Sequence, residues 1–330
     1  MADEPQVPRT GRAGHHLGPT PAASMPRASC QPLADARNST ASRGEVAPLA
    51  SGPMPYLYEV VGRDERASFA WPRSKAECQR LTEALAAMMA PALDRVGRMA
   101  GRPVPSPERL MGDFLAVYAK RPLIENKGGS GLNDSLWLYA VTRLLAPALI
   151  VESGTWRGQS AWLFRQAAPT AEIHSFDVER PPEGCHETPG VSFHLRDWTG
   201  VPLAPPATAP ALLFFDDHVS QARRLMEAAA RGFRLALFDD NFPAEQLHAT
   251  GAPPVPTLAM LLDEGRKRAG AIEWQRNGKI YRYHATAEHH AEARRLVEDL
   301  LILPELAPVT RHPPGSRMTM VRIASTARTS

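Results

Sequence analysis

One sharp bend in the sequence combines an acid with two glycines between apolar segments. Glu152 follows the apolar run Leu149–Val151, and Gly154 and Gly158 precede the apolar segment Ala161–Phe164. The pattern predicts a strand, a tight turn and a helix, because glycine permits backbone angles and close approaches that a Cβ atom would block. The first helical turn would point free N–H groups and the positive end of its dipole into the bend. With Glu152 beside it, the bend would suit a ligand that carries both a carboxylate and a cation.

The string Glu-Ser-Gly-Thr-Trp-Arg-Gly-Gln, which begins at Glu152, resembles the cofactor loop of class I methyltransferases that use S-adenosylmethionine (SAM). It is similar in particular to the macrocin O-methyltransferase and cephalosporin hydroxylase group, over about residues 130–245. The Gly-x-Gly-x-x-Gly spacing of dinucleotide-binding dehydrogenases is absent, which favours SAM over a dinucleotide. The resemblance implies SAM as the cofactor, with contacts from Glu152, Gly154, Thr155, Trp156, Gly158 and Ser160.

Acids at the ends of later predicted strands extend this cofactor site. Asp177 ends the segment 171–177, where a carboxylate can accept hydrogen bonds from vicinal ribose hydroxyls. The resemblance implies that Asp197 approaches the exocyclic amine of adenine and that Trp198 stacks on the base, while both equally suit ordinary loop positions. Asp216, which follows the fourth strand, completes the predicted cofactor-binding set.

A second group of acids follows the fourth and fifth predicted strands. Like charges crowded in one cleft repel, so a cation or a shared proton must offset them. Carboxylate and amide oxygens suit Mg²⁺ or Ca²⁺. The residues concerned are Asp216, Asp217, Asp239 and Asp240, with His218 and Asn241 beside them.

The resemblance implies a divalent metal at this position that holds two adjacent oxygens of the substrate. Asp239 and Asp240 match the Asp-Asp pair of the macrocin group, and Asp240 with Asn241 matches the Asp-Asn pair of catechol-type methyltransferases. Phe215 stands where the first acid of an Asp-x-Asp pattern is expected, so Asp216 or Asp217 replaces that acid or no metal binds. The predicted ligands are Asp217, Asp239 and Asp240. The alternative is that these acids cap loops by accepting backbone N–H bonds.

Methyl transfer needs a nucleophile held in line with the methyl carbon and a group that accepts its proton. An imidazole has an ordinary pKa near 6.5, so His218 is predicted to act as the general base. Asp217 is the rival base. A third interpretation is that His218 orients an aspartate.

Near-continuous apolar runs separated by helical segments predict the α/β fold that would position these residues. The class is a doubly wound, mostly parallel, Rossmann-like sheet of seven strands, with helices on both faces. Ligands of such sheets bind outside the carboxyl ends of the strands, where the acids fall. The first five strands are predicted within 148–153, 171–177, 190–195, 209–215 and 233–238.

The flanking segments divide the chain into three parts. We expect a disordered tail over 1–53, with an organelle transit peptide as the weaker alternative, a helical segment over 54–125, and the methyltransferase domain over 126–325 with a covering insertion at about 242–310. A helix is predicted over 74–99, which Pro91 kinks or divides, and a second helix begins at 106. Further helices are predicted over 135–145, 220–231, 257–268 and 287–300. A hairpin with its turn at 277–278 and a last strand over 318–323 are also predicted. Lys127 or Asn133, in a glycine-rich loop, is a candidate substrate or SAM contact.

The composition excludes several classes of protein. The formal charge of +3 arises from 38 basic and 35 acidic side chains, and no basic stripe with interleaved aromatic residues is present. We therefore expect a small-molecule methyl acceptor and neither nucleic acid nor membrane as partner, and we leave a homo-oligomer open. Three scattered cysteines and no secretory signal predict a cytoplasmic protein.

Together these features predict SAM-dependent methylation of a small molecule, with oxygen favoured as the acceptor atom and Mg²⁺ as a candidate cofactor. Two alternatives stay open. One is a hydroxylase-like relative of the same fold, and the other is a SAM- or nucleotide-binding module without catalysis.

Overall fold

The computed structural model describes residues 74–181, 184–243, 246, 254–262, 271–276, 279–284 and 286–325. The predicted tail over 1–53 and the turn at 277–278 lie outside the described residues.

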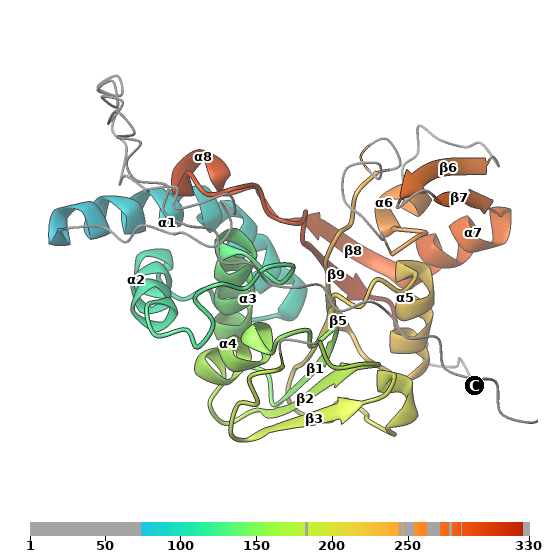
Figure 1. Ribbon diagram of the computed structural model, residues 1–330, viewed down its shortest axis with the longest axis horizontal. Coiled ribbons are helices and arrows are strands. Elements are labelled where there is room, and N and C mark those ends of the chain that lie inside the picture. Colours follow the sequence, from blue (N-terminus) through green and yellow to red (C-terminus); the bar gives the residue numbers. More distant parts are fainter. Residues whose placement is uncertain are drawn as a thin grey trace, which may run out of the picture. The chain divides into compact units, whose positions relative to one another are not determined.

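Seven strands form one sheet in the order β3-β2-β1-β4-β5-β9-β8 (Figure 1). Strands β1 to β5 are parallel, and β9 is antiparallel to both β5 and β8. The predicted doubly wound, mostly parallel sheet is therefore confirmed. The strands are β1 (Leu149–Ser153), β2 (Glu172–Asp177), β3 (Val191–Leu195), β4 (Ala211–Phe215), β5 (Leu235–Phe238), β8 (Val297–Ile302) and β9 (Thr319–Ile323).

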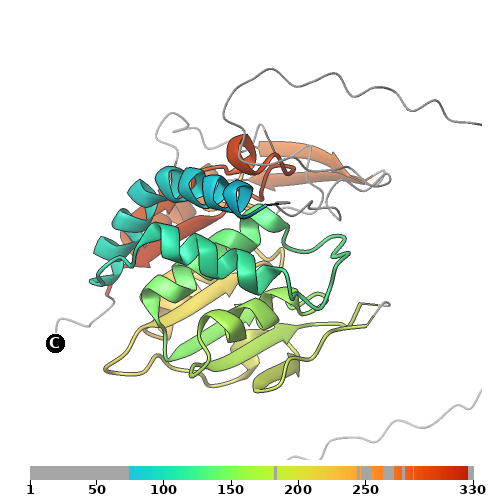
Figure 2. The same cartoon turned by 90° about the vertical axis from the view of Figure 1, so that its left-hand side faces the viewer.

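Helices cover both faces of the sheet, so the central strands are buried on both sides. One face packs on α1 (Lys75–Ala100), α2 (Pro107–Tyr118), α3 (Leu132–Leu145) and α4 (Gln159–Ala167). These helices lie in front of the strands in Figure 2. The other face packs on α5 (Gln221–Ala230), α6 (Leu258–Leu262), α7 (Ala287–Leu296) and the single 3₁₀ turn Trp198–Gly200. Alternate strand residues serve the two cores: Leu212 and Phe214 face the first, Leu213 and Phe215 the second.

The N-terminal helices begin where the sequence predicts. Ser74 caps α1 in a capping box with Glu77, and Ser106 caps α2 ahead of Pro107. Pro91 lies inside α1, which continues through it to Ala100, so the predicted division of this helix is wrong. The third helix begins at Leu132 and ends at Leu145.

The C-terminal part departs from the prediction at one point. The predicted helix over 287–300 ends at Leu296, and Val297–Ile302 instead forms β8, which pairs with β9. Tertiary pairing along the sheet edge overrides the local helical pattern here. The hairpin is confirmed as β6 (Ala271–Arg276) and β7 (Lys279–His284), and α8 (Ala307–Thr310) precedes β9. No helix among the described residues has the length and apolar content to cross a membrane.

Strands β1 and β4 are neighbours although they are not consecutive in the chain. Their connections leave in opposite directions, and in sheets of this kind such a switch point opens a crevice beyond the carboxyl ends of the strands. The residues that follow β1, β2, β3, β4 and β5 therefore meet at one edge of the sheet.

Candidate functional site

The bend after β1 is fixed by contacts of the chain with itself. Gly154 and Gly158 have φ of +106° and +83°, which favour glycine. A Cβ atom at Gly154 would overlap the carbonyl of Asp216, and one at Gly158 would overlap the carbonyl of His186. The glycines thus allow the backbone after β1 to pack against that after β4 and against the loop before β3. Gly158 precedes the first turn of α4, which contains Ser160.

Glu152 is fully buried at the end of β1. Its Oε2 accepts a hydrogen bond from the Ser175 hydroxyl at 2.5 Å, and Thr155 Oγ1 lies 2.6 Å from the same hydroxyl. Burial raises the pKa of Glu152 to about 7, against the lowering effect of the Ser160 and Ser175 hydroxyls. Its Oε1 makes no hydrogen bond with any described residue. A buried, unpaired acceptor costs free energy unless a donor outside the chain supplies the bond.

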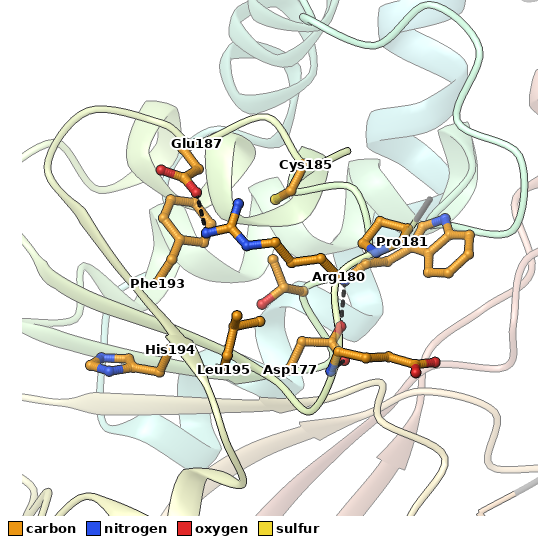
Figure 3. A pocket seen from close by; sticks show the side chains of 11 residues that line it. Asp177, Arg180, Pro181, Cys185, Glu187, Phe193, His194 and Leu195 are labelled. Atoms are coloured by element: carbon orange, nitrogen blue, oxygen red, sulfur yellow. Dashed lines mark hydrogen bonds and ion pairs between the residues drawn. The ribbon is translucent and has the colours of Figure 1, made fainter. Parts of the chain in front are cut away.

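Asp177 lies beside a hollow of about 300 Å³ that is partly open to solvent. Its carboxylate accepts hydrogen bonds from the backbone N–H of Trp156 at 2.9 Å and of Val178 at 2.8 Å. Figure 3 shows Arg180 extended over the hollow to an ion pair with Glu187, with N···O of 2.5 Å. The lining residues are Thr155, Trp156, Asp177, Glu179, Arg180, Pro181, Cys185, Glu187, Phe193, His194 and Leu195.

Apolar side chains stand exposed at the carboxyl ends of β2 and β3. Val178 is 75% exposed and Leu195 56% exposed, which is unusual for residues in a position to pack against a neighbour. Trp156 is also exposed, and its indole N–H donates to the Lys127 carbonyl at 3.0 Å. The glycine-rich loop before α3 therefore packs on the bend, and the apolar rim suits the flat face of an organic ring.

Asp197 and Trp198 are both engaged by other residues of the chain. Trp198 is fully buried, packs against Phe215 and Phe233, and donates its indole N–H to Glu227. It therefore presents no ring face for stacking on a base. Asp197 accepts hydrogen bonds from Thr199 and from Arg224. Partial burial alone would raise the pKa of Asp197, but the bonds from Arg224 and Thr199 hold it well below the ordinary value.

Asp217 is also engaged by Arg224. Its Oδ2 accepts from Arg224 Nε at 2.8 Å and from the Ser153 hydroxyl at 2.6 Å, and its Oδ1 accepts from the backbone N–H of Val219. Both oxygens of Asp217 are thus engaged by described residues, and its predicted catalytic and metal-binding roles stay predictions.

Asp216 and Asp239 form a different arrangement. Burial first, and then the charges of neighbouring acids, raises the pKa of both well above the ordinary value, although a hydrogen bond links the two carboxyls. Asp239 also accepts a hydrogen bond from the hydroxyl of Ser316, and this hydroxyl lies 3.0 Å from Asp134 Oδ1. One hydroxyl proton is directed at two carboxyls here, and an additional shared proton or a cation would stabilise the group.

Asp134 and Ser316 escaped the sequence analysis. Asp134 accepts hydrogen bonds from the backbone N–H groups of Ser316 at 2.9 Å and of Gly131 at 3.3 Å, and burial raises its pKa. The position of Asp134 in the first turn of α3 after Gly131 was a signal of a capping role. Ser316 lies in a Pro- and Gly-containing loop before β9, where the sequence offers no signal.

Asp240 and His218 complete the edge beyond β4 and β5. His218 Nε2 lies 3.7 Å from Asp240 Oδ2, and the His218 side chain is 51% exposed. Both line a second hollow of about 190 Å³, together with Phe215, Asp216, Asp217, Val219, Gln221, Asp239 and Pro254. Asn241 lies apart from this group, because its amide is fully engaged with Thr319 and the backbone N–H of Ala259.

Three of the six described non-glycine residues with positive φ follow strands at this edge of the sheet. Trp156, His218 and Asp240 have φ of +47°, +56° and +50°, a left-handed conformation that costs free energy for residues other than glycine. They follow β1, β4 and β5. Strained residues that gather at one edge of a sheet indicate a site whose geometry is maintained for function.

The predicted metal site can be compared with the arrangement of these acids. Within the described residues, no group of three or more His, Cys, Asp or Glu side chains has the geometry of a formed metal site. Asp216, Asp239 and Asp240 nevertheless line the same hollow, and carboxylate oxygens are ligands that suit a hard cation. Burial first, and then the charge of Asp240, raises the pKa of Asp216 and Asp239.

Comparisons with known proteins give only structural neighbours. No protein-family model matches the chain, and no curated protein does. Solved structures with similar folds include the SAH-bound Podospora anserina methyltransferase PaMTH1 (16% identity, 71% of this chain and 96% of that one, TM-score 0.35). An O-methyltransferase from Bacillus cereus in complex with SAH (10%, 74% and 100%, 0.32) and CmcI-D160 with Mg and SAM (13%, 64% and 84%, 0.37) are others. At such identities and TM-scores below 0.5 they do not identify the activity of this chain.

Proposed function

We propose that the chain is a SAM-dependent methyltransferase that acts on a small molecule, with oxygen as the favoured acceptor atom. The observation that carries the proposal is the unpaired, buried Oε1 of Glu152 at the switch point of the sheet. An ammonium group would supply the missing donor, and Asp177 offers a second carboxylate at the adjacent hollow. An amino acid joined to a nucleoside is a ligand with both features.

The residues that would hold SAM follow from these contacts. Glu152, Thr155 and Ser160 would contact the amino-acid end, and Asp177 with the exposed apolar side chains of Trp156 and Leu195 would contact the nucleoside end. SAM, when bound, supplies an electrophilic methyl group. Trp198 has no part in this proposal because its ring is buried.

The acceptor would bind in the second hollow, beside the acid group. His218 is the residue best placed to take the proton of the acceptor, since its side chain is half exposed and its Nε2 faces Asp240. Asp240 would orient His218 and stabilise its charged form. Asp217 supports the frame through Arg224 rather than acting as the base.

A divalent cation such as Mg²⁺ would be held by Asp216, Asp239 and Asp240. It would offset the repulsion among these acids and orient oxygen atoms of the acceptor. Asp134 and Ser316 would support Asp239 from behind.

The proposal is tested by calorimetric titration of SAM and SAH into the protein. We expect micromolar binding, and a loss of affinity of roughly 10-fold or more for Glu152→Gln and for Asp177→Ala, since each removes a carboxylate from the site. Glu172→Gln is the matched control, because Glu172 is an exposed acid at the opposite end of β2 from Asp177. Absence of SAM and SAH binding by the unsubstituted protein would refute the proposal.

A SAM-binding module without catalysis is the second candidate. The observation in its favour is the capture of Asp217 by Arg224, which removes one predicted base. Incubation with SAM and a panel of phenols, sugars and amines separates the two, because only an enzyme forms a methylated product with stoichiometric SAH. If SAM binds and no acceptor is methylated, the module is favoured.

A further inference from the structure

Arg224 is the most deeply buried charged side chain near the site that the proposed chemistry does not use. It lies on α5 and is 1% exposed. All three guanidinium nitrogens bond to carboxylates: Nε to Asp217 at 2.8 Å, Nη2 to Asp197 at 2.7 Å, and Nη1 to Glu227 at 2.7 Å. Although burial would lower the pKa of Arg224, its hydrogen bond with Asp197 and the charge of Asp217 raise it above the ordinary value.

Each of these carboxylates holds a different part of the sheet edge. Asp197, after β3, caps the turn at Thr199. Asp217, after β4, binds the backbone N–H of Val219 and also the hydroxyl of Ser153, the last residue of β1. Glu227, on α5 itself, receives the indole N–H of Trp198. One guanidinium therefore links the ends of β1, β3 and β4.

We propose that Arg224 is a positioning residue that sets the spacing between the two halves of the site. The proposal rests on the proposed function. The cofactor half depends on the ends of β1 and β3, where Leu195 lies, and the acceptor half depends on the residues after β4. Because one side chain fixes all three, a change in its geometry would alter both halves together.

The planar fork of arginine is essential to this role. A lysine carries the same charge, but its ammonium is a point donor on a flexible stem and cannot address carboxylates in three fixed directions. Arg224→Lys therefore tests the geometry of the hydrogen-bond donors separately from their positive charge. Arg224 is not a catalytic residue, since its burial leaves no surface for a substrate.

Arg231 provides a matched control. It follows α5, its guanidinium lies over the Trp198 ring with 4.6 Å from Cζ to the centroid, and it donates to the carbonyls of Thr199 and Val201. Arg231 thus stabilises the turn after β3, while its described contacts do not reach the ends of β1 or β4. Arg231→Lys should have a local effect only.

Amide hydrogen exchange tests the linkage without a ligand. Arg224→Lys should raise the exchange rates of both Thr199 and Val219, roughly 10-fold or more, because the carboxylates that accept their N–H groups lose one anchor. Arg231→Lys should raise the rate at Thr199 and leave Val219 within 2-fold of the unsubstituted protein. Exchange at Val219 that is unchanged in Arg224→Lys, or equally raised in Arg231→Lys, would overturn the proposal.

Calorimetry with SAH supplies the functional readout. Arg224→Lys should weaken SAH binding by roughly 10- to 100-fold, as is common for residues that orient ligand-binding groups, and Arg231→Lys by no more than about 2-fold. Asp217→Asn, which loses one ion pair and keeps its size, should weaken binding in the same direction by a smaller factor and serves if Arg224→Lys does not fold. Undiminished SAH affinity in both Arg224→Lys and Asp217→Asn would overturn the inference and leave the proposed function intact. If the unsubstituted protein fails to bind SAH, the proposed function is refuted. The role of Arg224 is not refuted by that result, because hydrogen exchange tests this role without a ligand.

Discussion

Two groups of carboxyls share one edge of the sheet and are stabilised in opposite ways. Asp197, Asp217 and Glu227 surround the guanidinium of Arg224. The second group is Asp134, Asp216 and Asp239. Ser316 bonds to Asp134 and to Asp239, a hydrogen bond links Asp239 to Asp216, and no lysine or arginine among the described residues forms an ion pair with these three acids. The pKa of Asp197 is lowered in the first group, while the pKa values of all three acids in the second are raised.

The contrast separates the frame of the site from its chemistry. In the first group each carboxylate bonds to Arg224, so removal of this one cation would leave three carboxylates without it. In the second, burial and neighbouring negative charges raise the pKa values of the acids, so their ionisation costs stability. Acids whose pKa is raised by burial and like charge are typical of functional sites, because a ligand can relieve the repulsion. The first group therefore maintains the shape of the site, and the second is the group that a ligand would bind.

The largest effect should come from removing the cation of the first group. Arg224→Met leaves three carboxylates beside an apolar side chain, and we expect a loss of about 3–5 kcal/mol in the free energy of unfolding. Urea denaturation measures it. A loss below about 1 kcal/mol would show that these acids do not depend on Arg224.

The second prediction concerns the cation proposed at Asp216, Asp239 and Asp240, beside the second group. Asp240→Ala should weaken Mn²⁺ binding, measured by electron paramagnetic resonance, by roughly 10-fold or more, since one of three oxygen ligands is lost. SAH affinity should stay within about 2-fold, and EDTA should release the metal without affecting SAH binding. Equal Mn²⁺ affinity in the variant and the unsubstituted protein would place the cation elsewhere or nowhere.

The third prediction uses the pH dependence of stability. Burial and the charge of Asp216 raise the pKa of Asp239, so the folded state keeps a proton that the unfolded chain loses above about pH 4. The free energy of unfolding contributed by this group therefore falls as pH rises above that value. Asp239→Asn should be more stable than the unsubstituted protein at pH 8, by on the order of 1 kcal/mol. This gain in stability should be smaller at pH 5.

Thermal denaturation at the two pH values measures this difference. Asp113→Asn is the control, because Asp113 is a half-exposed acid on α2 that lies away from the strand ends. If Asp239→Asn is destabilised at pH 8, then Asp239 is stabilised by contacts that outweigh its burial.

The smallest effect is expected at Glu152, which belongs to neither group. Its pKa of about 7 means that the carboxylate forms as pH rises from 6 to 7.5. SAH affinity should rise over this range by roughly 3-fold, since an ammonium group binds an ionised acid more tightly. The rise should be absent in Glu152→Gln, and its persistence there would assign it to another group.

Much of the frame could be predicted from the sequence because it depends on local patterns. Apolar runs marked the strands, acids marked their ends, and the two glycines marked the bend. The β8 strand could not be predicted, because pairing with β9 decides its conformation. No local pattern indicated that Trp198 is buried, since its core neighbours Phe215 and Phe233 come from other segments.

The division of the acids into two groups was also beyond the sequence. Asp216 and Asp217 are adjacent, yet one carboxyl joins Asp239 and the other joins Arg224. Ser316 reaches Asp239 across 77 positions of the chain and Asp134 across 182. The one local hint was Arg224 itself, a charged residue on the buried face of α5 beside Leu225 and Ala228.

The position of β9 between β5 and β8 has a consequence for synthesis on the ribosome. Because Ser316 lies 77 positions after Asp239, about 4 to 15 s of translation at roughly 5–20 residues per second separate the two. During that interval the nascent chain has made every parallel strand but neither closed the sheet nor covered the edge of β5. We expect chaperones that bind unpaired strand edges to meet this chain late in its translation.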